Sequence, residues 1–476
     1  MKIADLLRRE EGKTLEFKRD VSSPKNLLKT LVAFANTAGG QVIIGVDDKS
    51  RLSVGVENPL DEEERLCSLI TDSIRPRLVP NIEMTTVNGK TLLVVEVFLS
   101  GSRPHWLQAE GPEHGAFVRL GSTNRLADRE LLAELKRSVE NIAFDELPMP
   151  ELSVADLDLA VLKELFHDHR ILGERELLTL RLLTNEQGRR VPTKGAVLLV
   201  GKERERHFPD AWVQCGRFIG RDKADIFDHI ELYDPLPQAV ESILLFLKKH
   251  AMRTADFSAI RRKDCWSIPL GILREVVINA LVHADYSQKG GPIRVAFFDD
   301  RIEVENPGIL LPGLTLDDIR QGLSKIRNHV IARVFRELNL IEQWGSGIPR
   351  MFREAEELGL SELQIAEIGM RMRVTVPLPE SIATQKPTEQ ATEQATEQVR
   401  RILNCLKSGP LSVREAMDAL SLHHRPTFLY NYLHPVLDTG LVERTQPESP
   451  RSPKQKYRLT ARGEKVLFEG DPAEAG

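Results

Sequence analysis

The chain has 476 residues, too many for a single hydrophobic core, so two to four domains are expected. Its 65 Lys and Arg against 70 Asp and Glu give a net charge of −5, which excludes a protein that is basic overall and requires any nucleic-acid-binding surface to be local. The four cysteines are far apart with no CxxC spacing, which argues against a disulfide framework or a cysteine zinc site and favours a reducing, cytoplasmic environment. No apolar stretch is long enough to cross a bilayer, and the charged N-terminal segment lacks the apolar core of a signal peptide, so no membrane partner is expected.

The segment from Glu11 to Asp48 predicts a strand, a helix and a second strand. Leu15 and Phe17 alternate with polar neighbours, as in a strand with one buried face. Pro24 suits the first turn of the helix, and the pair Gly39-Gly40 suits its end. The apolar run that follows is typical of a strand covered on both faces.

Four polar residues of this segment are candidates for phosphodiester hydrolysis: Glu11, Glu16, Asp47 and Lys18. Carboxylates that converge repel one another unless a cation lies between them. Mg²⁺ or Mn²⁺ held by these acids and by phosphate oxygens, with Lys18 beside the metal, would suit strand cleavage. The alternative is a solvated strand face followed by a polar turn at Asp47-Asp48.

The blocks LEFKRD, AFANTAGG and IIGVDD resemble the Schlafen/AlbA-like nucleic-acid-binding domain, and the resemblance covers an α/β domain at residues 1–145. It implies contact with DNA or RNA. In nuclease-active Schlafen members an acidic trio carries metal-dependent RNA cleavage, and Glu11, Glu16 and Asp47 fit the spacing of that trio. Many bacterial relatives are DNA-binding or regulatory, so the resemblance implies binding more firmly than catalysis.

The strand Phe117–Leu120 leads into a polar turn that is a candidate phosphate contact. Guanidinium groups, hydroxyls and backbone donors beside a glycine suit phosphate. The residues concerned are Arg119, Ser122, Thr123 and Arg125. The alternative is the polar end of a hairpin, after which a helix from Asp128 to Asn141 closes the domain.

Residues 146–224 predict a connecting α/β region without visible chemistry. The segment 145–150 contains two prolines, which favour a domain boundary. A helix is expected over Val154–Phe166, and strands are expected over Gly195–Gly201 and Ala211–Gly220.

A helix after Pro269 places Glu275, Asn279 and His283 on one face, because they lie four residues apart. A Glu that activates water and an Asn that holds Mg²⁺ suit a triphosphate site. The alternative is a polar helix edge of unknown use. Further along, a Gly-Ser-Gly turn precedes a helix over Ile348–Glu357, where phosphate can meet backbone N–H groups.

The blocks REVVINALVHADY, DDRIEVENPG, IRN and WGSGIPRM resemble the RecG C-terminal-like domain, a divergent GHKL-type ATP-binding α/β sandwich, here at residues 225–380. The resemblance implies ATP, with Glu275 at the water-activating position and Asn279 at the Mg²⁺ position. Where typical members read adenine with Asp-x-Gly, this chain has Asn306 and Gly308, and the exchange of Asp for Asn weakens the expected contact. The lid-like turn contains Gly345 and Gly347. Hydrolysis is therefore less firmly implied than binding.

A helicase motor is not expected despite the RecG label. A P-loop needs the pattern GxxxxGK[ST] to hold phosphates. The two Gly-Lys-Thr triplets of the chain have Leu7 and Met84 where the upstream glycine would stand.

Residues 381–398 repeat Thr-Glu-Gln and predict a flexible linker, since they contain no large apolar residue. Residues 399–470 resemble a small winged helix-turn-helix, which would place one helix in the major groove. Candidate DNA contacts on that helix and on the wing are Arg425, Thr427, Asn431, Arg444, Lys454 and Lys456. The alternative is a module for dimerisation or protein docking.

Together these patterns predict a multidomain α/β and α+β protein, and they leave three hypotheses for its function. The first is a cytoplasmic regulator that binds DNA or RNA and senses ATP. The second is a metal-dependent nuclease that uses the acidic trio. The third is an assembly scaffold that forms a homo-oligomer.

Overall fold

The computed structural model divides the chain into two compact units, Met1–Ala383 and Thr384–Gly476. In the first unit it describes residues 3–48, 50–167, 169, 171–251, 253–256, 263–341 and 347–378. In the second it describes residues 401–407, 409–420, 428, 432–433, 436–437, 440–446, 455–461 and 463–464. The division falls inside the predicted linker 381–398, which lies outside the described residues.

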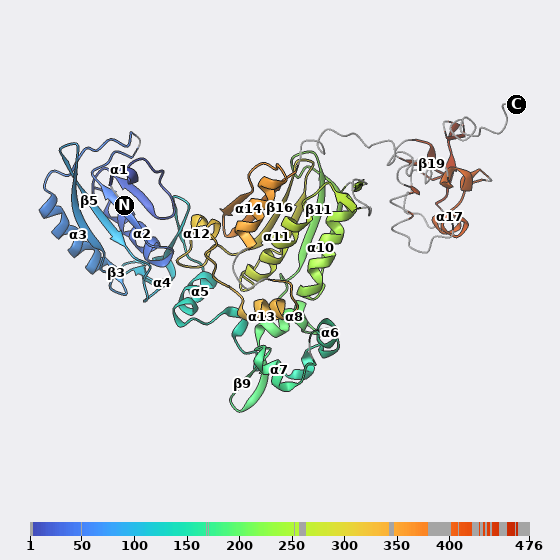
Figure 1. Cartoon of the computed structure of the whole chain (residues 1–476), viewed down its shortest axis with the longest axis horizontal. Coiled ribbons are helices and arrows are strands. Elements are labelled where there is room, and N and C mark those ends of the chain that lie inside the picture. The colour runs from blue at the N-terminus through green and yellow to red at the C-terminus, as the bar shows by residue number, and fades with distance from the viewer. Residues whose placement is uncertain are drawn as a thin grey trace. The chain divides into compact units, whose positions relative to one another are not determined.

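The first sheet follows the predicted strand–helix–strand pattern (Figure 1). Its strand order is β1-β2-β5-β4, with β1 and β2 parallel and the other pairs antiparallel. The elements are β1 (Leu15–Lys18), α2 (Pro24–Asn36), β2 (Gly40–Ile44), β4 (Asn81–Val87) and β5 (Lys90–Val97). Strand β2 is apolar throughout its second half because both of its faces are covered: Val42 and Ile44 pack with residues of α2 and of α3 (Pro59–Ser73), and Ile43 packs with Phe17.

Three of the remaining strands of the N-terminal region, β6, β7 and β8, contact helix α2. A helix from Asp128 to Asn141 is confirmed, because Asp128 accepts a hydrogen bond from Leu131 N at 2.8 Å and Asn141 ends the helix in the left-handed region. The elements are α1 (Ile3–Leu6), β3 (Ile74–Arg75), β6 (Trp106–Leu107), α4 (Gly111–His114), β7 (Phe117–Leu120), β8 (Thr123–Leu126) and α5 (Arg129–Glu140).

The connecting region is more helical than the sequence suggested. The predicted strand over Gly195–Gly201 is wrong, because this segment forms α8, which Thr193 caps by accepting a hydrogen bond from Ala196 N. An apolar run that is buried on all sides has neither helical nor strand periodicity, so its pattern could not decide. A Cβ at Gly195 would lie 2.6 Å from Val330 Cβ, and this close approach to α13 explains the glycine.

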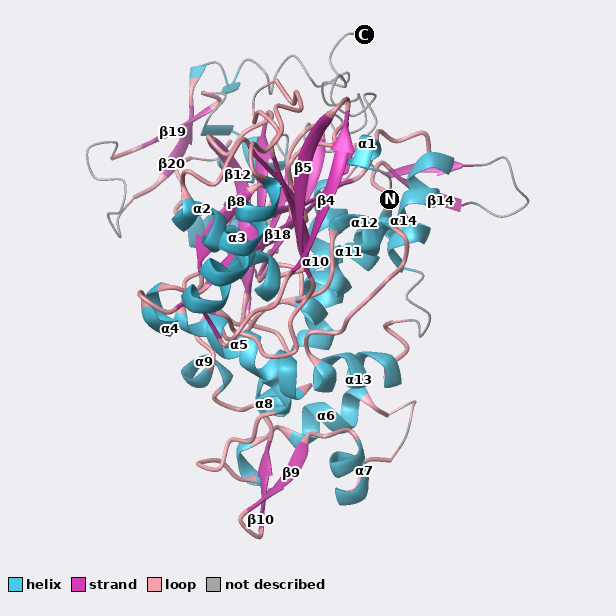
Figure 2. Ribbon diagram, turned by 90° about the vertical axis from the view of Figure 1, so that its left-hand side faces the viewer, coloured by secondary structure: helices cyan, strands magenta, loops and turns pink. Residues whose placement is uncertain are grey.

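The predicted helix Val154–Phe166 is divided into two pieces. The first is the short η2 (Val154–Asp156), and α6 (Leu159–Leu165) begins only after Asp158, which caps it. Figure 2 shows the β9–β10 hairpin beside α7 and α8. The other elements are η1 (Phe144–Glu146), α7 (Glu174–Thr179), β9 (Leu183–Glu186), β10 (Arg189–Pro192), α8 (Lys194–Val200) and α9 (Arg204–His207).

The second sheet has six strands in the order β12-β11-β15-β16-β18-β17, of which β11 and β15 are parallel and the other neighbours antiparallel. Its strands are β11 (Val213–Ile219), β12 (Asp225–Leu232), β15 (Ile293–Phe297), β16 (Arg301–Pro307), β17 (Gln364–Ile368) and β18 (Arg371–Pro377). Its helices are α10 (Leu236–His250), α11 (Leu270–His283), α12 (Leu316–Arg320), α13 (His329–Glu337) and α14 (Gly347–Glu357). A separate hairpin joins β13 (Arg253–Asp256) to β14 (Lys263–Trp266).

Strand β16 separates an apolar face from a charged one. Ile302 and Val304 join the core beneath α10 and α11, which lie side by side (Figure 1). The alternate residues Glu303 and Glu305 are buried carboxylates that pair with arginines of β16 and β18. One covered face and one charged face confirm the predicted α/β sandwich.

The two-proline segment that follows α5 is anchored to the second sheet's helices. Asp145 is fully buried and accepts hydrogen bonds from Val330 N at 2.7 Å and Ile331 N at 2.9 Å. Its carboxylate therefore caps α13, and the predicted boundary is a packed connection between elements.

The second unit has a small core of its own, with Ile402, Leu406, Phe428 and Val436 among its buried residues. Residues 401–406 are helical, α17 spans Val413–Ala419, and β19 (Val442–Arg444) pairs antiparallel with β20 (Tyr457–Leu459). Most of the predicted recognition helix lies outside the described residues. Across the described parts of the chain, no helix combines the length and the apolar character that crossing a membrane requires.

Candidate functional site

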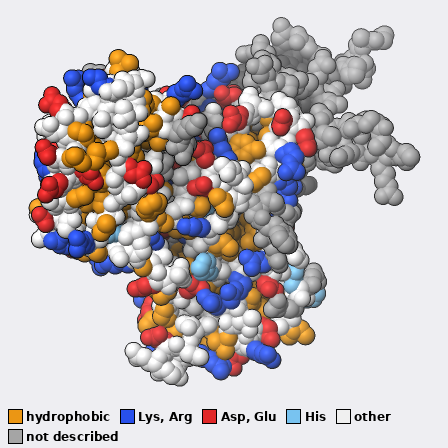
Figure 3. All heavy atoms as spheres, turned by 60° about the vertical axis from the view of Figure 1, so that its left-hand side comes forward, with side chains coloured by type: hydrophobic (Ala, Val, Ile, Leu, Met, Phe, Trp, Pro, Cys, Tyr) orange, Lys and Arg blue, Asp and Glu red, His pale blue; other side chains and the backbone are white. Residues whose placement is uncertain are grey.

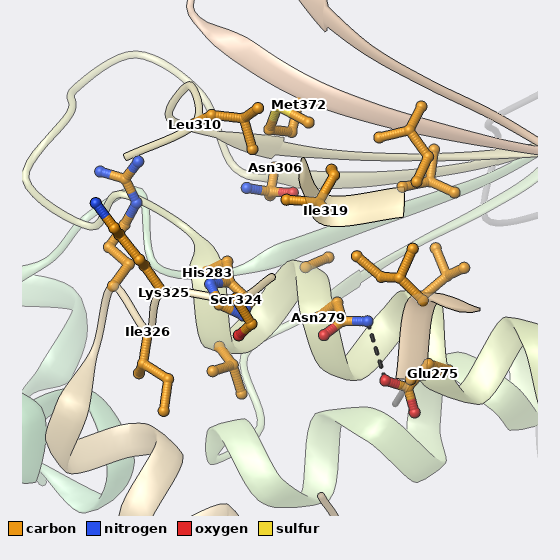
Figure 4. A pocket seen from close by; sticks show the side chains of 18 of the residues that line it. Glu275, Asn279, His283, Asn306, Leu310, Ile319, Ser324, Lys325, Ile326 and Met372 are labelled. Atoms are coloured by element: carbon orange, nitrogen blue, oxygen red, sulfur yellow. Dashed lines mark hydrogen bonds between the residues drawn. The ribbon is translucent and has the colours of Figure 1, made fainter. Parts of the chain in front are cut away.

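Helix α11 presents three polar residues to one cavity of about 210 Å³. Glu275, Asn279 and His283 follow one another at the helical spacing and all line this cavity (Figure 4). The other sides of α11, including Val277 and Leu281, are buried in the core. The predicted polar face of this helix is therefore the wall of a real pocket.

Strands β16 and β18 form the wall opposite α11. Asn306 stands near the end of β16, and its Nδ2 donates to Pro307 O at 3.1 Å. The next turn needs a glycine, because Gly308 has φ +102° and a Cβ there would lie 2.9 Å from Asp285 Cβ. Met372, which Figure 4 labels, adds apolar surface to this wall, as does Val374 of the same strand.

The segment from residue 309 to residue 327, called here the pocket loop, closes a third side. Ile319 lies over the centre of the pocket, while Ser324 and Lys325 lie at the end near His283 and away from Glu275 (Figure 4). The cavity is thus apolar in its middle and polar at both ends, an arrangement that suits a ligand with a flat apolar part and charged groups.

Glu275 lies at the start of α14 and has two polar partners. Asn279 Nδ2 donates to its Oε1 at 3.1 Å, and Arg350 Nη2 lies 3.2 Å from its Oε2. A Cβ at Gly347 would clash with the same Oε1, so a side chain at this position would require the Glu275 carboxylate to move. The carboxylate meets the N-terminal turn of α14, where partial positive charge favours an anion.

The imidazole of His283 lies deep in the same pocket. Burial and the nearby charge of Arg327 lower the pKa of His283 to about 4. The ring is therefore neutral at physiological pH and offers a hydrogen bond without a charge.

The four N-terminal candidates do not form a shared metal site in the structure. Among the described residues, no three His, Cys, Asp or Glu side chains lie close enough together to hold a metal ion. Glu11 Oε1 accepts a hydrogen bond from Phe17 N at 2.8 Å. Asp47 pairs with Arg19 at 3.3 Å and accepts from Ser50 N at 2.9 Å. Each acid thus has its own local partners.

Glu16 is the centre of a buried ion cluster. Its two carboxylate oxygens lie 2.5 Å from Lys18 Nζ and 2.5 Å from Arg119 Nη2. Arg119 is 1% exposed, donates to Gly12 O and Asn124 Oδ1, and lies over the ring of Phe34. This arginine, predicted as a phosphate contact, instead ties the β7–β8 hairpin to β1.

The other residues of the predicted phosphate turn are accessible. Ser122, Thr123 and Arg125 are exposed on the β7–β8 hairpin, and Thr123 Oγ1 donates to Leu120 O. In the second unit, Arg444 is exposed on β19, and Lys456 is exposed and pairs with Glu415 at 3.3 Å. The remaining predicted residues lie outside the described part of the chain: Gly345, Arg425, Thr427, Asn431 and Lys454.

Hydrogen bonds and ion pairs connect the pocket loop and the neighbouring strand β17 to the N-terminal region. Glu367 Oε1 on β17 accepts from Lys13 Nζ at 2.7 Å and from Leu310 N at 2.9 Å. Gly313 N donates to Thr37 O at 2.7 Å, just beyond the end of α2. Arg327 forms a buried ion pair with Glu134 of α5.

Sequence reasoning missed Lys13, Glu367, Lys325 and Arg350 as parts of this arrangement. Lys13 and Glu367 lie 354 residues apart, and Arg350 lies 75 residues from Glu275, so local spacing could not pair them. The approach of Arg350 to Glu275 had one detectable signal, since Arg350 follows the Gly-Ser-Gly turn by one helical turn.

Three family models match separate parts of the chain. Residues 11–128 match "Schlafen, AlbA_2", and residues 290–376 match "Putative ATP-dependent DNA helicase recG C-terminal". Residues 397–460 match "Filamentation induced by cAMP protein Fic-like, C-terminal domain". The second match begins after α11, so Glu275 and Asn279 precede it. No curated protein matches the chain.

The solved structures that are similar to the chain include the following three. The DIP2311 protein from Corynebacterium diphtheriae is 17% identical over 98% of both chains, with a TM-score of 0.42. The N-terminal domain of a putative ATP-dependent DNA helicase RecG-related protein from Nitrosomonas europaea is 29% identical over 27% of this chain and 94% of its own, with a TM-score of 0.22. A Fic family protein from Desulfovibrio desulfuricans G20 is 17% identical over 71% of this chain and 77% of its own, with a TM-score of 0.14.

The family-model matches confirm the two resemblances that the sequence motifs predicted, and they describe the C-terminal region as Fic-like. The chain thus combines a Schlafen AlbA_2 domain, a domain of the RecG C-terminal HATPase type and a Fic-like C-terminal domain.

Proposed function

We propose that the chain is a nucleic-acid-binding regulator whose affinity for DNA or RNA depends on ATP held between α11 and β16. The observation that carries the proposal is the set of bonds that join the surroundings of the nucleotide pocket to the Schlafen AlbA_2 domain. Glu367 accepts a hydrogen bond from Lys13 of that domain and another from the backbone N–H of Leu310 in the pocket loop.

The residues of the pocket fit a nucleotide with its metal. The apolar middle of the cavity suits a base, and Asn306 offers amide groups at its edge. Asn279 would offer a protein oxygen ligand for Mg²⁺, which usually has one or two such ligands together with phosphate oxygens, and Glu275 beside it would hold the attacking water. When bound, ATP supplies the triphosphate oxygens that complete such a coordination shell.

Nucleic acid is the partner that the family matches support. The Schlafen AlbA_2 match covers the N-terminal region, and the second match takes its description from a DNA helicase. Figure 3 shows basic and acidic side chains interspersed on one face of the molecule, so binding must rest on local groups. Ser122, Thr123 and Arg125 form one exposed set of phosphate donors.

A ligand in the pocket would act on the nucleic-acid domain through the pocket loop. Leu310, Ile319 and Lys325 of this loop line the cavity. The backbone N–H groups of Leu310 and Gly313 donate to Glu367 Oε1 and to Thr37 O. A nucleotide that orders the loop would therefore change the hydrogen bonds that hold the loop against the N-terminal region. Effector and nucleic acid then affect each other's affinity by the same factor.

The test measures binding of labelled DNA and RNA to the full chain by fluorescence anisotropy at low salt, with and without ATP and Mg²⁺. Wild-type protein should bind, and ATP should change the Kd several-fold. Glu367→Gln should still bind both ligands but lose the effect of ATP. Its matched control is Glu362→Gln, since Glu362 is 73% exposed and pairs with Arg320 only at 3.5 Å.

Failure of the full chain to retain DNA or RNA would overturn the proposal, and an unchanged Kd in the presence of ATP would overturn its regulatory half. Electrophoresis of the same mixtures with Mg²⁺ or Mn²⁺ tests the nuclease alternative. Cleavage that disappears in Glu11→Gln would support that alternative against the separate contacts of the three acids.

A further inference from the structure

A second cavity, of about 410 Å³, lies between α5 and the pocket loop. Three segments line it: the loop that contains Arg103, helix α5 with Glu134 and Arg137, and the end of the pocket loop with Lys325. Lys325 and Arg327 also line the nucleotide pocket, but Glu275, Asn279 and Asn306 do not reach this second cavity. It is therefore a separate site that shares one wall with the first.

Positive charge exceeds negative charge in this cavity. Five basic side chains line it, namely Arg103, Arg137, Lys325, Arg327 and His329, against the carboxylates of Glu134 and Asp285.

Two of the five basic groups have acidic partners. Arg327 pairs with Glu134 and lies 3.9 Å from Asp285, and His329 lies 3.1 Å from Glu146. Within the part of the chain that the structure describes, Arg103, Arg137 and Lys325 form no ion pair. Three cations therefore face the cavity without a counter-charge at contact distance.

Arg103 and Lys325 lie close enough to affect each other. Burial lowers the pKa of Arg103, and burial together with the charge of Arg103 lowers the pKa of Lys325. Arg103 donates to Ser138 Oγ at 3.2 Å, but its buried Nε has no hydrogen-bond partner among the described residues. A bound anion would reduce this repulsion and could accept from the unused donors.

We infer that this second cavity binds a phosphorylated small molecule through Arg103, Arg137 and Lys325. A phosphate group has several oxygens and can accept from cations that approach from different directions, as they do here from three segments. The volume lies in the usual range for small-molecule sites, roughly 300–1,000 Å³. Phe144 and Ile326 add apolar surface for the remainder of the molecule.

Such a ligand would join the two regions of the first unit. Arg103 and Arg137 belong to the N-terminal region, whereas Lys325 belongs to the loop that closes the nucleotide pocket. This site does not depend on the proposed function, because an anion can bind here whether or not the chain binds nucleic acid.

Isothermal titration of the full chain with pyrophosphate tests the inference. Wild-type protein should bind, and Arg103→Gln and Arg137→Gln should each weaken binding about tenfold or more, which is the loss of one charge-assisted contact. Arg65→Gln is the matched control, since it removes an arginine of the same N-terminal region that is 53% exposed and lies outside the cavity, and it should leave the affinity unchanged. Asn279→Ala should also leave it unchanged, because Asn279 lines the nucleotide pocket alone.

Two arginine variants are used so that misfolding cannot explain the loss of binding. Arg103→Gln also removes a hydrogen bond to Ser138, whereas Arg137 forms no side-chain hydrogen bond among the described residues. The inference is overturned if pyrophosphate fails to bind the wild-type chain. It is equally overturned if both arginine variants bind as the wild type does, or if Asn279→Ala abolishes binding and so places the anion in the nucleotide pocket.

Discussion

Glu16 and Glu275 are both acids that the sequence marks as catalytic candidates, yet the structure gives them opposite surroundings. Glu16 is buried between Lys18 and Arg119, and the side chain of Arg119 is 1% exposed. Glu275 lines an open pocket, and the side chain of its partner Arg350 is 43% exposed. Residue type and local spacing were equally suggestive in the two places.

The difference lies in what the rest of the chain supplies. Arg119 comes from a hairpin about a hundred residues after Glu16 and compensates its charge inside the protein. A buried ion pair of this kind is a structural element, because removing either partner leaves an uncompensated charge away from water. The surroundings of Glu275 leave its oxygens beside free space, where a ligand can compete for them.

The largest expected effect therefore belongs to the Arg119 side of the comparison. Arg119→Ala should destabilise the N-terminal sheet by ~3–5 kcal/mol, the usual loss when one partner of a buried pair is removed. Arg350→Ala should cost about 1 kcal/mol or less, because the side chain of Arg350 is 43% exposed and water screens its charge. Amide hydrogen exchange over β1 and β7 measures the first effect, and exchange over α11 and α14 measures the second.

Equal losses in the two variants would break the comparison, since they would mean that exposure does not separate the two acids. Glu16→Gln provides an independent check. It should speed exchange over β1 as Arg119→Ala does, because it also leaves Arg119 without its counter-charge.

Asp145 extends the comparison to a buried carboxylate whose nearest partners are backbone N–H groups rather than a cation. Burial raises the pKa of Asp145 to about 7, above its ordinary value of 3.8, despite the hydrogen bonds from Ile331 N and Val330 N. Between these two pH values the folded chain holds a proton that the unfolded chain has lost. The contribution of Asp145 to the free energy of unfolding should therefore fall as pH rises from about 4 to about 7, by up to ~1.4 kcal/mol per unit.

Asp145→Asn should remove this slope while keeping an acceptor for the start of α13. Urea unfolding followed by circular dichroism at several pH values measures the slope in both proteins.

Two neighbouring groups, Glu146 and His329, contribute to the pH dependence of stability in other pH ranges. Although burial opposes it, hydrogen bonds from His329 and Ala143 N lower the pKa of Glu146 to about 2, so its contribution is lost only below about pH 4.5. The bond to Glu146 raises the pKa of His329 above 6.5, so its contribution is lost above that pH. His283, whose pKa is lowered to about 4, adds a slope of opposite sign in the same pH range, but it does so in both proteins and cancels in their difference. Equal slopes for the wild type and Asp145→Asn between pH 4.5 and 6.5 would contradict the assignment.

A smaller effect is expected on the Glu275 side, and it should appear in binding rather than in stability. Asn279→Ala removes an amide from the pocket wall and should weaken ATP binding about tenfold, or ~1.4 kcal/mol. The free energy of unfolding should change little, because the side chain faces the cavity. Titration with ATP and Mg²⁺ gives the affinity, and an unchanged Kd would place any nucleotide elsewhere.

Much of the fold could be predicted from local patterns. The helix Leu236–His250 and the hairpin of β15 and β16 have clear periodicity and clear turns, and the structure contains both. The segment Lys194–Val200 has neither, because a helix buried on all sides is uniformly apolar, and it was predicted as a strand.

The candidate sites divide in the same way. Glu275 and Asn279 share a pocket because helical spacing alone puts them on one face, and this spacing is visible in the sequence. Glu16 is buried and structural because Arg119 pairs with it. The pocket loop is connected to the N-terminal region through Lys13 and Glu367, which lie 354 residues apart. Contacts between such distant residues follow from the packing of whole elements, so no local pattern predicts them.

The smallest expected effect separates the two arginines of the β7–β8 hairpin. Arg119 and Arg125 were both predicted as phosphate contacts, but only Arg125 is exposed. If the hairpin binds nucleic acid, Arg125→Ala should weaken binding a few-fold at low salt and reduce the slope of log K against log salt by about 1, because one phosphate contact is lost. The free energy of unfolding should stay within about 0.5 kcal/mol, as is usual for a surface change. Anisotropy titrations at several salt concentrations give the slope, and Arg206→Ala, which removes a 76% exposed arginine on α9, is the control. An unchanged slope in Arg125→Ala would remove the hairpin from the nucleic-acid surface and leave both of its arginines with structural roles alone.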